Sequence, residues 1–390
     1  TTKNHLAAPI KRSSCSYVRD TMNHPIPLFS AERVNAGVDL HTPALRVIDS
    51  HWYVLGNEVS SFEQEFAAYC GASACVSLAN GTDALELGLR ALDVGPGDRV
   101  VLAANAGFYG STAVHAIGAT PIYVDVNPET LTLSADAVRN ALRNEQPKAI
   151  VVTHLYGQLG DIESIIAIAE QAKIPVIEDC AQSHGAARDG RRAGSFGTIG
   201  CFSFYPTKNL GALGDGGAVI TSCTEVDKRL RQLRQYGWGA KYHVTVTGGR
   251  NSRLDEMQAA ILRDKLPHLN RWNAERRHIA RRYNQAFSGL PLRCPASLGD
   301  DYVAHLYVVR LAGRDDFRAF LKEHSIVTDV HYPVPDHLQA AYASPTDAAL
   351  PVTEDACNTV VSLPCFPGMT DEEVERVSRV VCLYFEEKTR

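Results

Sequence analysis

The sequence lacks the features that mark several large classes of protein. Its ten cysteines include no CxxC pair, no GxGxxG motif follows an early strand, and no apolar run approaches the roughly 18 residues of a spanning helix. Basic residues are not in excess either: 39 Lys and Arg stand against 44 Asp and Glu, a formal net charge of −5. These absences argue against a structural zinc site, a Rossmann dehydrogenase, an integral membrane protein and a general nucleic-acid binder.

What is present is typical of a folded chain of more than one domain. The 390 residues are 45% hydrophobic and 21% charged, and this length exceeds that of one small module. The cysteines are scattered, and several lie inside apolar runs. We therefore expect buried, reduced thiols and a cytoplasmic protein.

The pattern along the chain predicts a leader and two domains. Residues 1–21 are polar, carry several basic side chains, and are expected to be a leader outside the fold. Residues 22–265 alternate helical stretches with short β-rich runs, which predicts a mostly parallel sheet covered by helices on both faces. Residues 266–390 are expected to form a smaller α+β domain. The predicted strands are 75–78, 100–103, 120–125, 149–153 and 175–179, followed by 306–311 and 327–331.

The most informative residues are an acid and a lysine between 178 and 217. Asp179 ends a predicted strand, where ligands of such sheets bind, and Lys208 stands between an apolar strand and a glycine-rich turn. Burial lowers the pKa of a lysine and makes its amine nucleophilic. A buried carboxylate with such a lysine suits pyridoxal phosphate, because the lysine forms the Schiff base and the acid keeps the pyridine nitrogen protonated. A helix cap and a solvated turn lysine are the plainer interpretation of the same two residues.

A third element suits a phosphate. Gly81 and Thr82 lie between a predicted strand and a helix, where amide hydrogens and a hydroxyl can receive an anion. The same residues also form an ordinary N-cap sequence.

Taken in order, four segments resemble the sugar-nucleotide aminotransferases, which are fold-type-I pyridoxal phosphate enzymes related to aspartate aminotransferase. The resemblance covers nearly the whole chain. The segments are 81–85 (GTDAL), 178–182 (EDCAQ), 204–211 (FYPTKNLG) and 251–260 (NSRLDEMQAA).

The resemblance implies a role for each matching residue. Lys208 is the Schiff-base lysine and moves the proton during catalysis, and Asp179 pairs with the pyridine nitrogen. Gln182 binds the phenolic oxygen of the cofactor. The residues expected to hold the phosphate are Gly81, Thr82, Asp83 and Ser203, together with Asn251 from the neighbouring subunit of a homodimer with shared active sites.

One position departs from the family pattern. Where the family places an aromatic ring over the cofactor, this chain has Gly107, so Phe108, or else Tyr109, is expected to take that role. Substrate contacts are expected from the following residues, and no metal site is expected: His154, Tyr156, Arg253, His331 and Tyr332.

The expected reaction is transfer of an amino group from L-glutamate to a nucleotide-linked keto-sugar. Lys208 favours transamination, because the dehydratases of the family carry histidine there. Gln182 and the 205–217 segment most resemble members that aminate C-3 of a dTDP-linked 3-keto-6-deoxyhexose. The alternatives are a UDP-linked 3-keto-uronic sugar, a 4-keto sugar, a keto-cyclitol, and a non-catalytic regulator that binds the cofactor or a sugar nucleotide.

Overall fold

The computed structural model describes residues 24–342 and 349–388. The predicted leader, residues 1–21, and Cys15 lie outside these ranges. The nine cysteines within them are free thiols, as expected.

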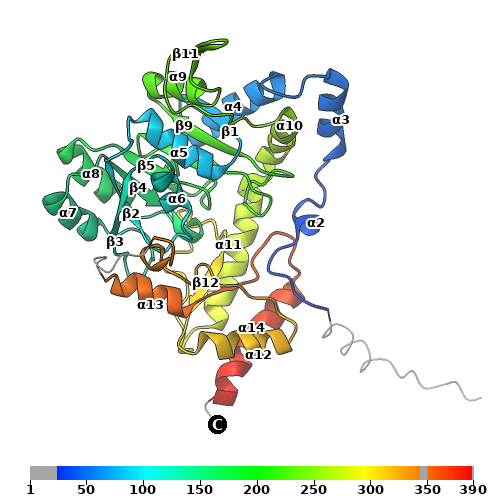
Figure 1. Ribbon diagram of the computed structural model, residues 1–390. Coiled ribbons are helices and arrows are strands. Elements are labelled where there is room, and N and C mark those ends of the chain that lie inside the picture. Colours follow the sequence, from blue (N-terminus) through cyan, green and yellow to red (C-terminus); the bar gives the residue numbers. More distant parts are fainter. Residues whose placement is uncertain (1–23, 343–348, 389–390) are drawn as a thin grey trace, which may run out of the picture.

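A seven-stranded sheet forms the centre of the molecule (Figure 1). Its strands follow the order β1-β9-β8-β5-β4-β2-β3. The run from β8 to β3 is parallel, and β9 is antiparallel to both of its neighbours. The strands of the sheet are β1 (Ala74–Leu78), β2 (Arg99–Ala103), β3 (Thr120–Val124), β4 (Ala149–Thr153), β5 (Val176–Asp179), β8 (Ile199–Ser203) and β9 (Gly217–Thr221).

Helices cover both faces of this sheet because alternate strand residues are apolar on both sides. Val100 and Leu102 of β2 pack in one core cluster, whereas Val101 and Ala103 pack in the other. The first cluster takes apolar residues from α5 (Gly81–Ala91), α6 (Tyr109–Ala116) and α9 (Thr224–Leu233). The second takes them from α4 (Asn57–Cys70), α7 (Ala135–Asn144), α8 (Ile162–Ala172) and α10 (Glu256–Lys265). The predicted fold class is thereby confirmed.

The C-terminal part forms a third core cluster. α11 (Leu269–Ala286) runs from α10 down to this part, and a 3₁₀ turn at Leu266–His268, which contains Pro267, separates the two helices (Figure 1). The other elements here are β12 (Tyr307–Arg310), α12 (Arg314–Glu323), α13 (Pro351–Thr359), β13 (Val360–Leu363) and α14 (Asp371–Lys388).

Short elements complete the described chain. They are α2 (Ala31–Val34), α3 (His41–Ser50), β6 (Ala187–Arg188), β7 (Arg191–Arg192), β10 (Trp238–Ala240), β11 (His243–Val244), and 3₁₀ turns at Leu155–Gly157 and Asp336–Leu338. Among residues 24–342 and 349–388, no helix is both long and apolar enough to cross a bilayer.

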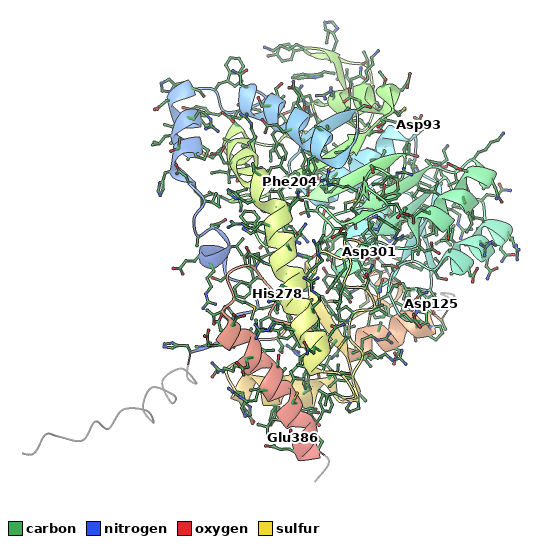
Figure 2. All side chains as sticks on the ribbon, turned by 180° about the vertical axis from the view of Figure 1, so that it is seen from behind. Asp93, Asp125, Phe204, His278, Asp301 and Glu386 are labelled. Carbon is green, nitrogen blue, oxygen red and sulfur yellow. The ribbon has the colours of Figure 1, made fainter. Side chains whose placement is uncertain are left out.

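Two contacts tie the ends of the chain to the rest. Ile26 belongs to the C-terminal core and bridges Ile326, although the predicted division assigns it to the large domain. Asp125, after β3, accepts hydrogen bonds from the N–H groups of Val352 and Thr353 at 3.0 and 2.9 Å and so caps α13 (Figure 2). The division at 265/266 stays a prediction.

One predicted strand is wrong. The 327–331 segment makes a single bridge, between Asp329 and Ser362, and is otherwise irregular. Pro333 and Pro335 follow it and have no N–H to continue a ladder. The segment instead contributes side chains to the cavity described next.

Candidate active site

A cavity of about 870 Å³ lies where the carboxyl ends of the central strands meet the C-terminal part. Its polar lining includes most of the predicted cofactor residues. These are Gly81, Thr82, Asp179, Gln182, Ser203 and Lys208, joined from the C-terminal part by His331 and Tyr332.

Asp179 and Lys208 form the charged centre of the cavity. The Asp179 carboxylate accepts hydrogen bonds from Ala181 N–H at 3.1 Å and Thr153 Oγ1 at 3.2 Å. Burial raises its pKa, against the lowering effect of the Ala181 hydrogen bond and the Lys208 charge. Burial lowers the pKa of Lys208 to about 8, although Asp179 opposes this. Neither charge is therefore fully neutralised by the other. A cationic group bound beside Asp179 would offset the free-energy cost of burying its carboxylate.

The N-terminus of α5 forms one end of the cavity. Asn80 caps this helix, its Oδ1 accepting from Asp83 N–H at 2.8 Å, while the N–H groups of Gly81 and Thr82 have no partner within the helix. Gly81 lies so close to β8 that an added Cβ would stand 2.6 Å from Ser203 Cβ. Amides, hydroxyls and the helix dipole are the groups that bind a phosphate.

Asp83 corrects part of the predicted phosphate site. Its side chain does not line the cavity; the carboxylate lies 3.4 Å from Arg250, and its N–H is taken by Asn80. Asp83 is an ordinary first-turn residue of α5 whose side chain lies outside the cavity lining.

Gln182 is held at both ends of its amide. Its Oε1 accepts from Tyr156 N–H at 2.6 Å, and its Nε2 donates to Tyr332 Oη at 3.1 Å. The Tyr156 hydroxyl donates to the carbonyl of His331. Tyr156, predicted as a substrate contact, is buried and outside the cavity lining, where it holds Gln182 and His331.

The expected ring-stacking residue also needs correction. Phe108 has a left-handed backbone, and its ring packs on His115 and Tyr342, away from the cavity. The cavity is lined instead by Tyr109, which meets Tyr332 edge to face. At Gly107, an added Cβ would lie 2.8 Å from the Tyr332 ring. Tyr332 therefore occupies the space beside the position where the family carries its aromatic residue.

His154 is a structural residue, contrary to its predicted place at the substrate. It is wholly buried, its Nδ1 accepts from Gly160 N–H, and its Nε2 donates to Glu178 at 2.9 Å. His154, Glu178 and Cys180 lie close enough together to suggest a metal site. However, both Glu178 oxygens already accept hydrogen bonds, and both ring nitrogens of His154 are engaged, so the cluster offers a metal few free lone pairs.

Two further predicted residues lie outside this cavity. Arg253 is half-buried, and Asn251 is exposed and forms an isolated antiparallel bridge with Gln235. His184 is buried against Phe202 and Phe204, and burial lowers its pKa to about 3.

Sequence reasoning missed several lining residues from the C-terminal part, among them Arg276, His305 and Asp329. Arg276 stands in a helix rich in arginine, so no local signal distinguishes it. The helix periodicity gives one indication, because Arg276 lies on the same buried face as Ile279, Ala280 and Tyr283.

Comparison with known proteins agrees with this geometry. Residues 38–382 match the DegT/DnrJ/EryC1/StrS aminotransferase family. The chain is 44% identical over 362 residues to the dTDP-3-amino-3,6-dideoxy-alpha-D-galactopyranose transaminase of Aneurinibacillus thermoaerophilus, covering 92% of this chain and 99% of that protein. It is 40% identical over 364 residues to the UDP-N-acetyl-3-dehydro-alpha-D-glucosamine 3-aminotransferase of Acidithiobacillus ferrooxidans, covering 93% and 98%.

The fold comparison agrees as well. The crystal structure of S. venezuelae DesV, in complex with a ketimine intermediate, has a TM-score of 0.89 and 40% identity over 93% of this chain and 99% of that one. The cofactor of these enzymes is pyridoxal phosphate. This chain belongs to the DegT/DnrJ/EryC1/StrS aminotransferase family.

Proposed function

We propose that this aminotransferase moves an amino group from L-glutamate to C-3 of a dTDP-linked 3-keto-6-deoxyhexose. The observation that carries transamination is the shared cavity of Asp179 and Lys208, with the α5 N-terminus at one end. The C-3 position is supported by the names of both relatives, one a transaminase of a 3-amino sugar and the other a 3-aminotransferase of a 3-dehydro sugar.

The bound cofactor supplies an electron sink for the carbanion at the reacting carbon. Asp179 holds a proton at the ring nitrogen, where its buried carboxylate gains a cationic partner. Lys208, whose pKa is lowered to about 8 by burial, has enough neutral amine near neutral pH to take the proton from the donor α-carbon and would deliver it to C4′ of the cofactor. Gln182, fixed by Tyr156 and Tyr332, orients the cofactor from the side.

The phosphate is held by the Gly81 and Thr82 amides, the Thr82 hydroxyl and Ser203. The close approach of Gly81 to Ser203 supports this, because any larger residue would close the cradle. Tyr109 is the aromatic residue of the 105–109 turn that reaches the cavity and contacts the cofactor ring.

Asn251 contributes from the neighbouring subunit of a homodimer. Its exposed position, away from the cavity of its own chain, supports that role, and the residue follows the protruding β10-β11 hairpin closely (Figure 1). The sugar is held by His331 and Tyr332, which line the cavity, and the diphosphate of the nucleotide extends beyond that lining to Arg253.

The first half-reaction is tested by the visible spectrum. The protein with pyridoxal phosphate is expected to be yellow, and L-glutamate is expected to bleach the band. Lys208→Ala should form no such band. Lys265→Ala is the matched control, because Lys265 is also buried with a pKa lowered to about 8 but lies outside the cavity. A wild-type protein with no band would contradict the Lys208 assignment.

The acceptor is tested by a panel of dTDP- and UDP-linked 3-keto and 4-keto sugars, with product structure determined by NMR. A UDP-linked 3-keto sugar is the second candidate, favoured by the 40% identical relative named for a UDP sugar. An amine at C-4 of the product would overturn the assignment of C-3.

A further inference from the structure

The turn that carries Lys208 is anchored by the side chain of the next residue. The segment between β8 and β9 contains no helix or strand, so no regular hydrogen-bond ladder sets the place of the Lys208 amine. Asn209 is 2% exposed, and its amide contacts the C-terminal part. Its Nδ2 donates to Asn273 Oδ1 at 2.8 Å and to the Val303 carbonyl at 3.0 Å, and its Oδ1 lies 3.0 Å from His305 Nδ1. One buried amide therefore joins this turn to the C-terminal part.

Two backbone carbonyls fix the orientation of this network. A carbonyl can only accept, so Asn273 directs its Nδ2 to the carbonyl of His184, 2.8 Å away, and its Oδ1 to Asn209. Asn209 in turn directs its Nδ2 to the Val303 carbonyl and its Oδ1 to His305. The ring proton of His305 therefore lies on Nδ1, and Nε2 keeps a lone pair.

His305 connects this network to the cavity. Its ring lines the cavity, and no group in the described part of the chain bonds its Nε2. The charged and titratable groups that act on the ring are Lys208, Arg276, His184 and His331. Burial holds the pKa of His305 far below its usual range, and the charges of the lysine and the arginine lower it further. The ring therefore offers the cavity an accepting nitrogen and no charge.

We propose that Asn209 is a positioning residue that fixes Lys208 against the C-terminal part and holds His305 with its proton on Nδ1. This inference rests on the proposed function of Lys208. Because the segment around Lys208 has no regular structure, loss of the amide would let the turn and the imidazole move independently. The ring would then take either tautomer, and the lysine amine would no longer be held at one place relative to the C-terminal part.

The tautomer is measured by nitrogen-15 NMR of the full chain labelled in histidine, without cofactor. His305→Gln assigns the signal. In wild type, the His305 signal should show a proton on Nδ1 and no titration between about pH 5 and pH 8. Asn209→Ala should show both tautomers. A wild-type ring with its proton on Nε2, or a variant that keeps the wild-type tautomer, would overturn the proposal.

The position of Lys208 is measured by the rate at which L-glutamate bleaches the cofactor band. The limiting rate should fall about 10- to 100-fold in Asn209→Ala, the cost of a misplaced reacting group, while the half-saturating concentration changes less than threefold. Asn284→Ala is the matched control. Its amide also links two segments, donating to the Pro295 carbonyl and accepting from Tyr307 Oη, and it lies outside the cavity. It should keep the wild-type rate.

Asn209→Asp gives a pH signature. A carboxylate keeps the acceptor for His305, loses both donors, and raises the pKa of the ring through its charge. The bleaching rate of this variant, divided by that of wild type, should recover as the pH rises and the ring loses its proton. The same ratio for Asn209→Ala should stay constant, and the NMR signal of His305 should titrate in the aspartate variant alone.

A wild-type bleaching rate in Asn209→Ala, or an equal loss in Asn284→Ala, would overturn this proposal alone. A wild-type protein without a cofactor band would overturn the role of Lys208, and this proposal with it. If neither variant of Asn209 folds, His305→Gln decides, and an unchanged bleaching rate there overturns the proposal. If L-glutamate leaves the wild-type band unchanged, the amino acid that does bleach it is used; if none does, the tautomer in Asn209→Ala decides.

Discussion

Two neighbouring carboxylates at the end of β5 lie on opposite sides of the sheet and have opposite surroundings. Glu178 accepts from the N–H groups of Gly194, Phe196 and Gly197 at 2.8, 2.7 and 2.6 Å, and from His154. Asp179 has only the Ala181 N–H and the Thr153 hydroxyl, and it faces Lys208 across a cavity. Both side chains are buried.

The difference shows how to separate a structural charge from a functional one. A carboxylate whose lone pairs are all used fixes the loop around it, and removing it leaves several buried donors unpaired. A buried carboxylate with unused lone pairs is unfavourable in the unliganded protein, and a ligand that binds to it can offset that cost. Glu178 is of the first kind and Asp179 of the second.

Asp179→Asn is expected to give the largest functional effect of any substitution in this pair. Turnover should fall about 100- to 1,000-fold, because the amide cannot hold a proton at the ring nitrogen. The free energy of unfolding of the cofactor-free protein should stay within about 1 kcal/mol of wild type, since the site already disfavours the charge. Steady-state kinetics and urea unfolding measure the two. A large loss of stability would mean that Asp179, like Glu178, is a structural carboxylate.

Glu178→Gln should have the opposite effect, lowering stability much more than activity. Glutamine offers one oxygen to donors that now share two, so the free energy of unfolding should fall by about 3 kcal/mol. Protein that remains folded should keep most of its activity per active site, counted by bound cofactor. Chemical unfolding and active-site titration test this, and a stable but inactive variant would contradict it.

The two buried lysines extend the comparison to cations. Burial lowers the pKa of Lys265 to about 8, from the ordinary 10.5. The folded protein therefore binds fewer protons than the unfolded chain between these values, and stability from this group rises with pH across that window. Lys265→Met should be more stable than wild type at pH 7, and its advantage should shrink by roughly 2 kcal/mol by pH 10. Parallel stability curves would show that Lys265 is not desolvated.

The sequence predicts the sheet better than it predicts the cavity. Strand periodicity and the position of Asp179 at the end of β5 are local properties, so the parallel core and the two central charges follow from them. Phe108 and Tyr109 illustrate the limit. Which of two adjacent aromatic rings faces a cavity depends on one backbone angle, here the φ of 69° at Phe108, which nothing in the local pattern fixes.

His331 and Tyr332 were predicted, but three other residues that the C-terminal part contributes to the cavity were not, for another reason. Arg276, His305 and Asp329 are brought to the cavity by packing of distant elements, and each has ordinary neighbours in sequence. His154 shows the converse error: a polar residue after a strand lies near the site in sequence but is used to complete the hydrogen bonds of Glu178.

Asp336 is a third buried carboxylate and gives the smallest and most precise test. It accepts from Ser111 Oγ at 2.6 Å and Phe108 N–H at 3.0 Å, and so holds the turn that presents Tyr109. Burial raises its pKa from 3.8 to about 6, so with two donors it resembles Asp179 more than Glu178.

Between these two pKa values the folded protein binds more protons than the unfolded chain, and stability from this group is lost as pH rises through 6. Asparagine does not titrate. As the pH rises from 4 to 7, the free energy of unfolding of Asp336→Asn should therefore increase by roughly 1 to 2 kcal/mol relative to that of wild type. Urea unfolding of both proteins across that range measures the difference, in which the titration of all other groups cancels. A constant difference would mean that two donors already satisfy a buried carboxylate here, and that Asp179 needs another explanation for its raised pKa.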